Sequence, residues 1–169
     1  VSQPPVAASL AWEVYRANPG QGAARLRALF PKMVAFHRWI IEARAESGAV
    51  AIAHPWEAGR DNAPDWDEAM AGIDPVGVAP YTRRDTGHVD AQMRPTQADY
   101  DRYIWLVQFG RERAWDDAKI AAESPFRVAD PTMTFTALRA LRDLARAADV
   151  LGEDSAEITY WIQYLEAGS

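Results

Sequence analysis

The fourteen residues from His54 to Asp67 constrain the fold most, because they cannot form one regular helix. They read HPWEAGRDNAPDWD and combine four carboxylates, two tryptophans and a histidine with Gly59 and two prolines. A proline removes a backbone donor and clashes with the preceding helical turn. We therefore expect a loop that ends in a helix start at Asp65, whose short side chain can cap a first turn.

Helical patterns of apolar residues flank this loop on both sides. Apolar residues recur with the spacing of one helix face in residues 6–17, 21–29, 32–44, 96–117, 131–151 and 158–165. A short apolar run at 49–53 is interpreted as a strand or as buried extended chain. The sequence therefore predicts an all-α fold of about six helices, with long loops at 48–65 and 72–95.

Several local signals set the expected helix boundaries. Pro31 is expected to end the second helix, or to restart a new one at its first turn, where proline is tolerated. Thr96 is expected to cap a helix that runs to about Asp117, and Asp130 to cap the next long helix. The segment 103–109 is apolar almost all round, which predicts burial on several sides.

Composition and charge exclude several classes of function. The 169 residues, enough for one domain, carry a net charge of −6 spread along the chain, whereas a nucleic-acid partner would need a basic face. No apolar run approaches the ~20 residues that span a bilayer, so no membrane partner is expected. There is no cysteine, hence no disulfide and no thiol chemistry. The N-terminus has neither an initiator methionine nor a signal peptide, so we expect a cytoplasmic protein and a piece of a longer chain.

The acidic loop offers the groups that glycoside hydrolysis requires. That reaction needs a carboxylic acid that protonates the leaving oxygen and a second carboxylate on the other side of the bond. All the loop carboxylates are candidates for the acid: Glu57, Asp61, Asp65 and Asp67. Asp61 is favoured, because Gly59 lets the backbone approach closely and Glu57 supplies a like charge that favours the protonated form. Trp56 and Trp66 offer flat apolar faces to a sugar ring.

Ordinary structural roles explain much of the same loop. Aspartate and asparagine in a loop with glycine and proline are commonly turn formers. Asp65 and Asp67 are expected at a helix start, and Trp66 in the core. Glu57 could equally hold the loop by accepting backbone amides. His54, Glu57 and Asp61 could ligate a metal, but they lack the paired spacing of the known zinc motifs, so no metal and no cofactor are expected.

The same fourteen residues resemble a family signature. HPWEAGRDNAPDWD is similar to the HPWExGxDNSPxWD signature of glycoside hydrolase family 63 and its relatives, the mannosylglycerate and glucosylglycerate hydrolases. The shorter core ExGxD is also similar to the trehalase signature among the six-hairpin glycosidases. LFPK and FHRW at 29–39, and RPT, DY and RY at 94–103, resemble neighbouring family segments. The segment from Ser124 to Asp130 and the expected helix at 138–152 fit as well, so the resemblance covers residues 29–152.

The resemblance implies part of an (α/α)6 toroid, in which helix hairpins ring a central pocket. Residues 1–169 would be an incomplete, acid-bearing part of this catalytic domain. The family inverts at the anomeric carbon, and its general acid is the aspartate of the GxDN step, here Asp61. Trp56 would lie beside the sugar, while Arg94 and Tyr100 resemble residues that hold the aglycone carboxylate in the glycerate-specific members.

The expected function is therefore an inverting glycoside hydrolase that cleaves an α-glucoside or α-mannoside, with glucosylglycerate or mannosylglycerate as the leading substrates. Asp61 is the expected catalytic residue, and the expected substrate-binding residues are Trp56, Glu57, Arg60, Asn62, Arg94 and Tyr100. Two positions depart from the pattern, since Ala63 replaces a serine and Arg60 a methionine. The family's base, a late glutamate, matches no segment here, so the chain alone is expected to be inactive.

Two alternatives stay open. A trehalase-like or oligosaccharide glucosidase would use the same acid on a neutral substrate. A non-catalytic, carbohydrate-binding helical fragment would keep the loop without turnover. In each case the partner is a small carbohydrate. An incomplete toroid with uncovered apolar faces is expected either to be marginally stable or to self-associate into a homo-oligomer.

Overall fold

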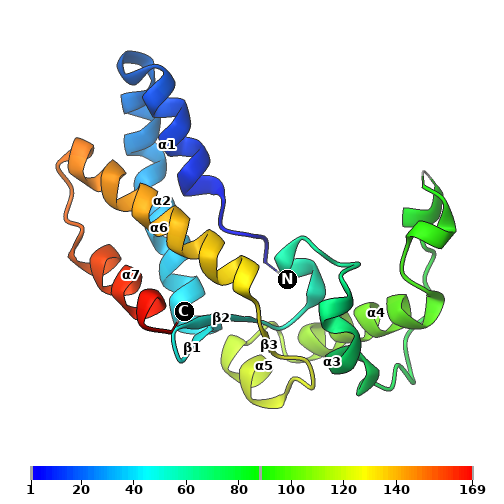
Figure 1. Ribbon diagram of the computed structural model, residues 1–169. Coiled ribbons are helices and arrows are strands. Elements are labelled where there is room, and N and C mark those ends of the chain that lie inside the picture. Colours follow the sequence, from blue (N-terminus) through cyan, green and yellow to red (C-terminus); the bar gives the residue numbers. More distant parts are fainter. Residues whose placement is uncertain (1, 88, 169) are drawn as a thin grey trace. The chain divides into compact units, whose positions relative to one another are not determined.

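The computed structural model describes residues 2–87 and 89–168, and these residues are mostly helical (Figure 1). The α-helices are α1 (Ala7–Ala17), α2 (Pro19–Arg44), α3 (Asp67–Ala71), α4 (Gln97–Glu112), α5 (Asp117–Glu123), α6 (Pro131–Leu151) and α7 (Ala156–Gly168). Short strands are β1 (Ala45–Glu46), β2 (Ala49–Ile52) and β3 (Val128–Ala129). The long loops carry short 3-10 helices: η1 (Pro55–Ala58), η2 (Pro64–Trp66), η3 (Asp85–Gly87) and η4 (Ala91–Met93). The predicted all-α class is confirmed, with a small sheet added.

The chain divides into two compact units. The first, here called the loop unit, holds Ile52–Val128 and the first residues of the chain. The second, here called the helical unit, holds Pro4–Ala51 and the residues from Ala129 onward. The acidic loop, α3, α4 and α5 therefore belong to one unit, and α1, α2, α6 and α7 to the other.

Helix α6 is the centre of the helical unit, because α1, α2 and α7 all pack against it (Figure 1). Its buried apolar side chains recur with helical spacing and include Leu138, Leu141, Leu144, Ala148 and Leu151. Asp130 caps its start by accepting hydrogen bonds from two backbone amides, and Gly152 ends it with a φ of 69°. These boundaries agree with the sequence prediction.

Helix α2 contradicts the expected break at Pro31, since it runs without interruption from Pro19 to Arg44. A proline inside a helix removes one hydrogen bond and costs about 3 kcal/mol. The apolar face on both sides of Pro31 includes Leu26, Phe30, Met33 and Ile40, all buried. Packing of this face against α1 and α6 offsets the lost hydrogen bond, and the proline ring itself is exposed.

The chain leaves α2 through a short antiparallel hairpin between β1 and β2. Ala45 pairs with Val50 and Glu46 with Ala49, so two residues form the turn. Ser47 and Gly48 both adopt positive φ angles, 51° and 81°, as the tightest hairpin turns require. β2 lies between β1 and β3 in the sheet, which confirms a strand in the apolar run at 49–53.

Helix α4 ends at Glu112, earlier than the sequence predicts, and α5 follows as a separate helix. Ala114 and Trp115 interrupt the helical conformation, because they adopt φ angles of 53° and 58°. The ring of Trp115 lies against Gly110, where an added Cβ would be 2.5 Å from it. This contact fixes the turn, although neither residue with a positive φ angle is a glycine and the sequence therefore gives no local signal for it.

Burial of α4 is deepest on one face, but every residue of 103–109 is buried or partly buried, as the apolar pattern of this segment predicts. The buried residues are Tyr103, Leu106, Phe109 and Gly110, which share one face. Ile104, Trp105, Val107 and Gln108 are only partly buried in the described structure. At the N-terminus of α4, Thr96 is the cap, as predicted, and accepts a hydrogen bond from the Asp99 amide at 3.2 Å.

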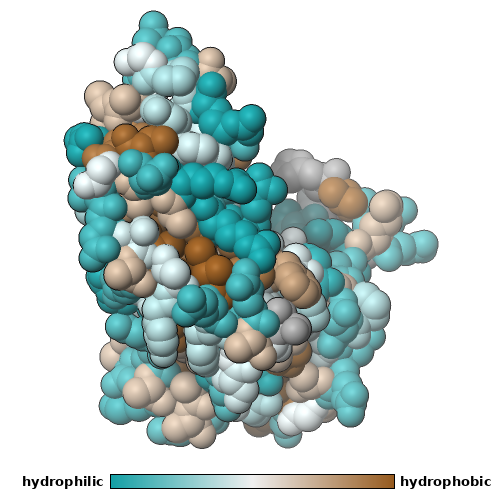
Figure 2. Space-filling view, turned by 60° about the vertical axis from the view of Figure 1, so that its left-hand side comes forward, coloured by the Kyte–Doolittle hydropathy of each residue, from teal (hydrophilic) through white to brown (hydrophobic). Residues whose placement is uncertain are grey.

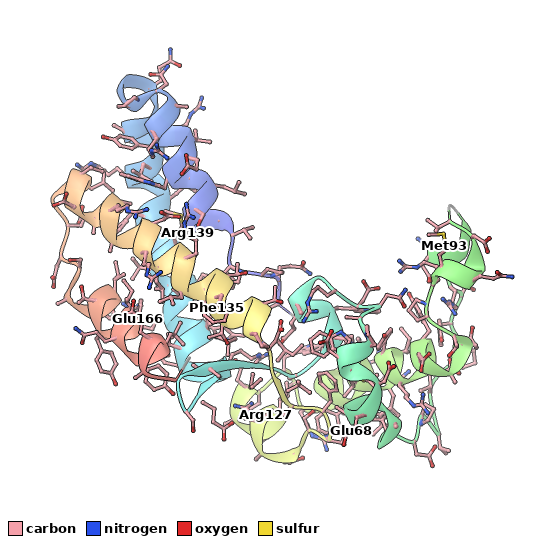
Figure 3. All side chains as sticks on the ribbon, viewed as in Figure 1. Glu68, Met93, Arg127, Phe135, Arg139 and Glu166 are labelled. Atoms are coloured by element: carbon pink, nitrogen blue, oxygen red, sulfur yellow. The ribbon has the colours of Figure 1, made fainter. Side chains whose placement is uncertain are left out.

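Several large hydrophobic side chains reach the surface of the helical unit. Leu10 and Val14 on α1 are 62% and 57% exposed, and Phe135 on α6 is 57% exposed. Figure 2 shows hydrophobic residues, in brown, at the surface between hydrophilic ones in teal. Phe135 and Arg139, both labelled in Figure 3, line a hollow of about 480 Å³ between α6 and the start of α1. Within the described residues, none of the helices combines the length and hydropathy needed to cross a membrane.

Candidate active site

The acidic loop begins with a 3-10 turn rather than an extended segment. Pro55 occupies the first position of η1, where its missing donor costs nothing, and His54 precedes it as the cap. Gly59 ends the turn with a φ of 66°, a left-handed conformation that glycine adopts without strain. The chain then turns again between Arg60 and Ala63, closed by a backbone hydrogen bond of 3.0 Å.

Asp61 lies in this second turn, and its side chain is 31% exposed. Its Oδ2 atom lies 3.3 Å from Nη2 of Arg94, so the predicted acid and the predicted carboxylate-binding cation contact each other. The two residues are 33 positions apart in the chain. The charge next to Asp61 is thus a cation, whereas the sequence analysis emphasised the neighbouring Glu57.

Arg94 is held from its other side by Asp85. The Asp85 Oδ2 atom accepts from Nε of Arg94 at 3.2 Å and from Nη2 of Arg83 at 2.7 Å. These bonds, that from Arg83 first and that from Arg94 next, lower the pKa of Asp85 to about 2 against the opposing effect of burial. Arg83, Asp85, Arg94 and Asp61 therefore form a row of alternating charges, which we call the charge row.

Aromatic rings line the same region of the loop unit. The Trp56 ring lies 6.1 Å from that of Tyr100 and 6.0 Å from that of Tyr103. Tyr100 stacks on Tyr81 at 5.7 Å, and the guanidinium of Arg83 lies 4.4 Å from the Tyr100 ring. Burial, followed by the hydrogen bond to Asp101, raises the pKa of Tyr81 to about 12. The predicted residues Trp56 and Tyr100 are thus neighbours, next to the charge row.

Glu57 holds the loop from inside. Its side chain is buried, with 1% exposure. Its Oε2 atom accepts from the Ala53 amide at 3.1 Å, and its Oε1 atom from the Ser2 amide at 3.2 Å. This geometry matches the structural alternative for Glu57, in which the carboxylate accepts backbone amides.

The remaining predicted substrate contacts, Arg60 and Asn62, bind other parts of the loop unit. Arg60 pairs with Asp65 at 3.0 Å, and its guanidinium lies 5.0 Å from the Trp66 ring. The side-chain amide of Asn62 donates to the carbonyl of Met93 at 3.1 Å, and Figure 3 labels Met93 in η4. Arg60 therefore braces the acidic loop internally, and Asn62 ties the loop to η4.

The structure corrects one predicted cap and confirms a core residue. Asp65 is not a helix cap: Pro64 starts η2 one residue earlier, so Asp65 lies inside that turn and pairs with Arg60. Asp67 begins α3, as predicted. Trp66 is 2% exposed and packs edge-on against Phe126, so its ring belongs to the core and not to a sugar platform.

His54 has both ring nitrogens engaged, which excludes it as a free metal ligand. Nδ1 accepts from the Trp56 amide at 3.0 Å, so Nε2 carries the proton and donates to the carbonyl of Tyr103 at 3.0 Å. Burial lowers the pKa of His54 to about 4, and the hydrogen bond to Tyr103 only partly opposes this. The ring is therefore a neutral structural element.

Sequence reasoning missed the residues that hold the predicted site together. In the sequence, Asp85 and Arg83 are only polar residues of a long loop, and Tyr103 belongs to a family-like segment of an apolar helix without a predicted role. The signal for Asp85 was its place between two arginines, Arg83 and Arg94, in a loop without regular structure. No local signal links Tyr103 to Asp61, because 42 residues separate them.

Comparison with known proteins now places the chain in a family. A family model described as "Mannosylglycerate hydrolase MGH1-like glycoside hydrolase domain" matches residues 1–169. The mannosylglycerate hydrolase of Thermus thermophilus is 42% identical over 172 residues, covering 99% of this chain and 41% of that protein. The mannosylglycerate hydrolase MGH1 of Selaginella moellendorffii is 43% identical, covering 95% of this chain and 34% of that protein. The glucosylglycerate hydrolase of Mycolicibacterium hassiacum is 28% identical, and the match covers 99% of this chain and 41% of that protein.

Solved structures show the same fold. A family 63 mannosylglycerate hydrolase of Thermus thermophilus in complex with Tris and D-glycerate superposes with a TM-score of 0.95 at 41% identity. Its complex with glucose superposes with a TM-score of 0.92. These comparisons cover 99% of this chain and 41–42% of the solved chains, so the chain spans about two fifths of the length of these relatives.

The family match over the full sequence and the shared fold agree with the signature in the acidic loop. They confirm the predicted relationship to family 63 and to part of its helical toroid. The chain therefore belongs to the MGH1-like mannosylglycerate hydrolase family of glycoside hydrolases.

Proposed function

We propose that this chain is the acid-bearing part of the catalytic domain of an inverting glycoside hydrolase whose substrate is an α-glycoside with an acidic aglycone. The observation that carries the proposal is the contact between Asp61 and Arg94, a carboxyl group beside a cation, among aromatic rings. Relatives named mannosylglycerate hydrolase are 37–43% identical and the glucosylglycerate hydrolase is 28% identical, which favours mannosylglycerate as the substrate.

Asp61 is the proposed general acid. In its protonated form it would donate to the glycosidic oxygen as the bond to the sugar breaks. Its partial exposure supports this role, because the carboxyl group can reach a substrate while the turn holds its backbone. The buried Glu57 has no comparable access, since its oxygens accept from backbone amides of the loop unit.

Arg94 is the proposed site for the aglycone carboxylate. A guanidinium binds a carboxylate through two parallel hydrogen bonds, and Arg94 is 27% exposed. Asp85 accepts from its Nε atom and Asp61 from its Nη2 atom, so the aglycone carboxylate is proposed to bind the remaining N–H groups of the two terminal nitrogens, next to Asp61. Tyr100, which lies beside Arg83 and Trp56, is proposed to contact the same aglycone, and Trp56 is proposed to support the sugar ring.

An inverting reaction also needs a base that activates water on the opposite face of the sugar. The chain spans about two fifths of its relatives, and the proposal assigns the base to a glutamate in a later segment of the protein. The 169-residue chain by itself is therefore proposed to lack turnover. Arg60 and Asn62 are proposed to shape the acid's loop at the edge of the substrate site.

Substitution of Arg94 tests the substrate class. In the full-length protein, Arg94→Gln should lower kcat/KM for mannosylglycerate by about 10- to 100-fold, because a hydrogen bond to a charged group contributes roughly 1.5–3 kcal/mol. Methyl α-mannoside, which has no carboxylate, should be affected much less. Arg84→Gln, at an exposed arginine in the same loop, is the matched control.

Equal losses on the acidic and the neutral substrate would contradict the proposed aglycone. They would favour a trehalase-like or oligosaccharide glucosidase activity instead. Sugar binding without any turnover of either substrate by the full-length wild type would favour the non-catalytic alternative.

A further inference from the structure

The backbone of Asp61 is held by ring donors from two other elements. Within the turn, the carbonyl of Arg60 accepts from the Ala63 amide at 3.0 Å and from the indole Nε1 of Trp66 at 2.8 Å. The carbonyl of Asp61 itself accepts a hydrogen bond from the phenol of Tyr103. Two consecutive carbonyls of the acid's turn are thus fixed by buried aromatic side chains.

Tyr103 also fixes the opposite end of the acidic loop. Its backbone carbonyl accepts from Nε2 of His54 at 3.0 Å. One residue of α4 therefore binds the loop at His54 through its backbone and at Asp61 through its side chain. Tyr103 is 5% exposed, so this connection is largely shielded from water.

The phenol of Tyr103 is a dedicated donor under ordinary conditions. Burial first, and then the nearby carboxylates of Asp61 and Asp99, raise its pKa to about 12. It therefore keeps its proton throughout the pH range in which glycosidases work, and it faces a carbonyl rather than an open space. No part of the proposed mechanism needs this hydroxyl to touch the substrate.

We propose that Tyr103 is a positioning residue for the general acid, which it holds in place by hydrogen bonding the Asp61 carbonyl from α4. The inference rests on the proposed function of Asp61. A carboxyl group displaced by about 1 Å loses much of its catalytic effect, with losses of about 100-fold known for such shifts. The hydrogen bonds from Trp66 and Tyr103 to the backbone of this turn explain how the partly exposed carboxyl group of Asp61 can keep a defined direction.

The test uses Tyr103→Phe in the full-length enzyme, because phenylalanine keeps the ring and removes only the donor. Two substrates separate positioning of the acid from general damage. Mannosylglycerate has a poor leaving group that needs a proton, whereas α-mannosyl fluoride releases fluoride without one. We expect kcat for mannosylglycerate to fall at least tenfold and kcat for α-mannosyl fluoride to change less than twofold.

Control variants distinguish a failure of the acid role of Asp61 from a failure of the positioning role of Tyr103. Tyr160→Phe should leave kcat for both substrates unchanged, because Tyr160 on α7 is 63% exposed. Asp61→Asn tests the proposed function alone: if it leaves mannosylglycerate turnover intact, the acid assignment fails whatever Tyr103 does. In the Asp61→Asn background, Tyr103→Phe should add less than a twofold loss, since the two residues act through one group.

Two outcomes would overturn the inference while Asp61 stays essential. One is an equal loss on both substrates, which would mark Tyr103 as a purely structural residue; the other is no loss on either. If Tyr103→Phe fails to fold, 3,5-difluorotyrosine at position 103 retains the ring and hydroxyl but ionises at lower pH. The pH above which mannosylglycerate turnover falls should then be lower than in the wild type, with no such shift for fluoride turnover, and an alkaline limb unchanged from wild type would contradict the proposal.

Discussion

Two carboxylates four residues apart in one loop have different surroundings, and this separates their roles. Glu57 is 1% exposed and accepts backbone amides, whereas the Asp61 side chain is 31% exposed and faces Arg94. The sequence could rank Asp61 first from its neighbours Gly59 and Glu57. The contact between Asp61 and Arg94 could not be predicted from the sequence, because Arg94 lies in a separate loop whose path depends on tertiary packing.

Glu57 should be worth more to folding than to catalysis. Glu57→Gln replaces one acceptor oxygen by a donor amide, which leaves a buried backbone donor without its partner and costs about 1–3 kcal/mol. Chemical denaturation of the full-length protein measures this loss. Glu68→Gln is the matched control, because Glu68, labelled in Figure 3, is exposed on α3. Indistinguishable unfolding free energies for the two variants would refute the structural role of Glu57.

His54 should make the protein sensitive to mild acid. Its folded pKa of about 4 lies below the ordinary 6.5, so the unfolded state binds more protons between these values. The stability from the neutral ring is fully present above pH 6.5 and is lost as pH falls toward 4. The melting temperature should therefore drop over this range, and less steeply in His54→Gln.

Nitrogen-15 NMR of the histidine rings gives an independent check on His54. A neutral ring with the proton on Nε2, unchanged from about pH 7 to about pH 5, is the expected result. A ring that titrates near the ordinary pKa of 6.5 would show that the buried hydrogen bonds to Trp56 and Tyr103 do not form.

At the scale of elements, prediction succeeded where local and tertiary signals agree. Helix α6 has a cap at Asp130, a proline at its first position, an evenly spaced leucine face and a terminal glycine, and it lies where these signals place it. Prediction failed for α2, where packing overrides Pro31, and between α4 and α5, where the contact of Trp115 with Gly110 fixes a turn. Both failures come from contacts that no local pattern contains.

The leucine face of α6 should dominate the stability of the helical unit. Leu144 is fully buried, and Leu144→Ala leaves a cavity that costs about 2–5 kcal/mol. Val150→Ala, on the same helix but 45% exposed, should cost less than about 0.5 kcal/mol. Urea unfolding of both variants gives the comparison, and equal losses would contradict the central position of α6.

For the whole molecule, the acidic loop carried most of the functional prediction. Its fourteen residues, with the segment from Arg94 to Tyr103, pointed to the family that the full-length match confirms. The connections that turn these segments into a site are tertiary: Asp85 to Arg94, Tyr103 to Asp61, and Glu57 to the backbone. A sequence reveals which residues are present, but hydrogen bonds between residues far apart in the chain require the folded structure.

The most direct measurement is mannosylglycerate hydrolysis by the full-length protein and its Asp61→Asn variant, followed by proton NMR from the first seconds. We expect the wild type to release the β-anomer of the sugar first, because the proposed reaction inverts an α-glycoside. We also expect a roughly 100- to 10,000-fold lower rate for Asp61→Asn, the loss typical of a general acid. First release of the α-anomer, or turnover within about tenfold of wild type in Asp61→Asn, would contradict the role of Asp61 as the acid of an inverting hydrolase.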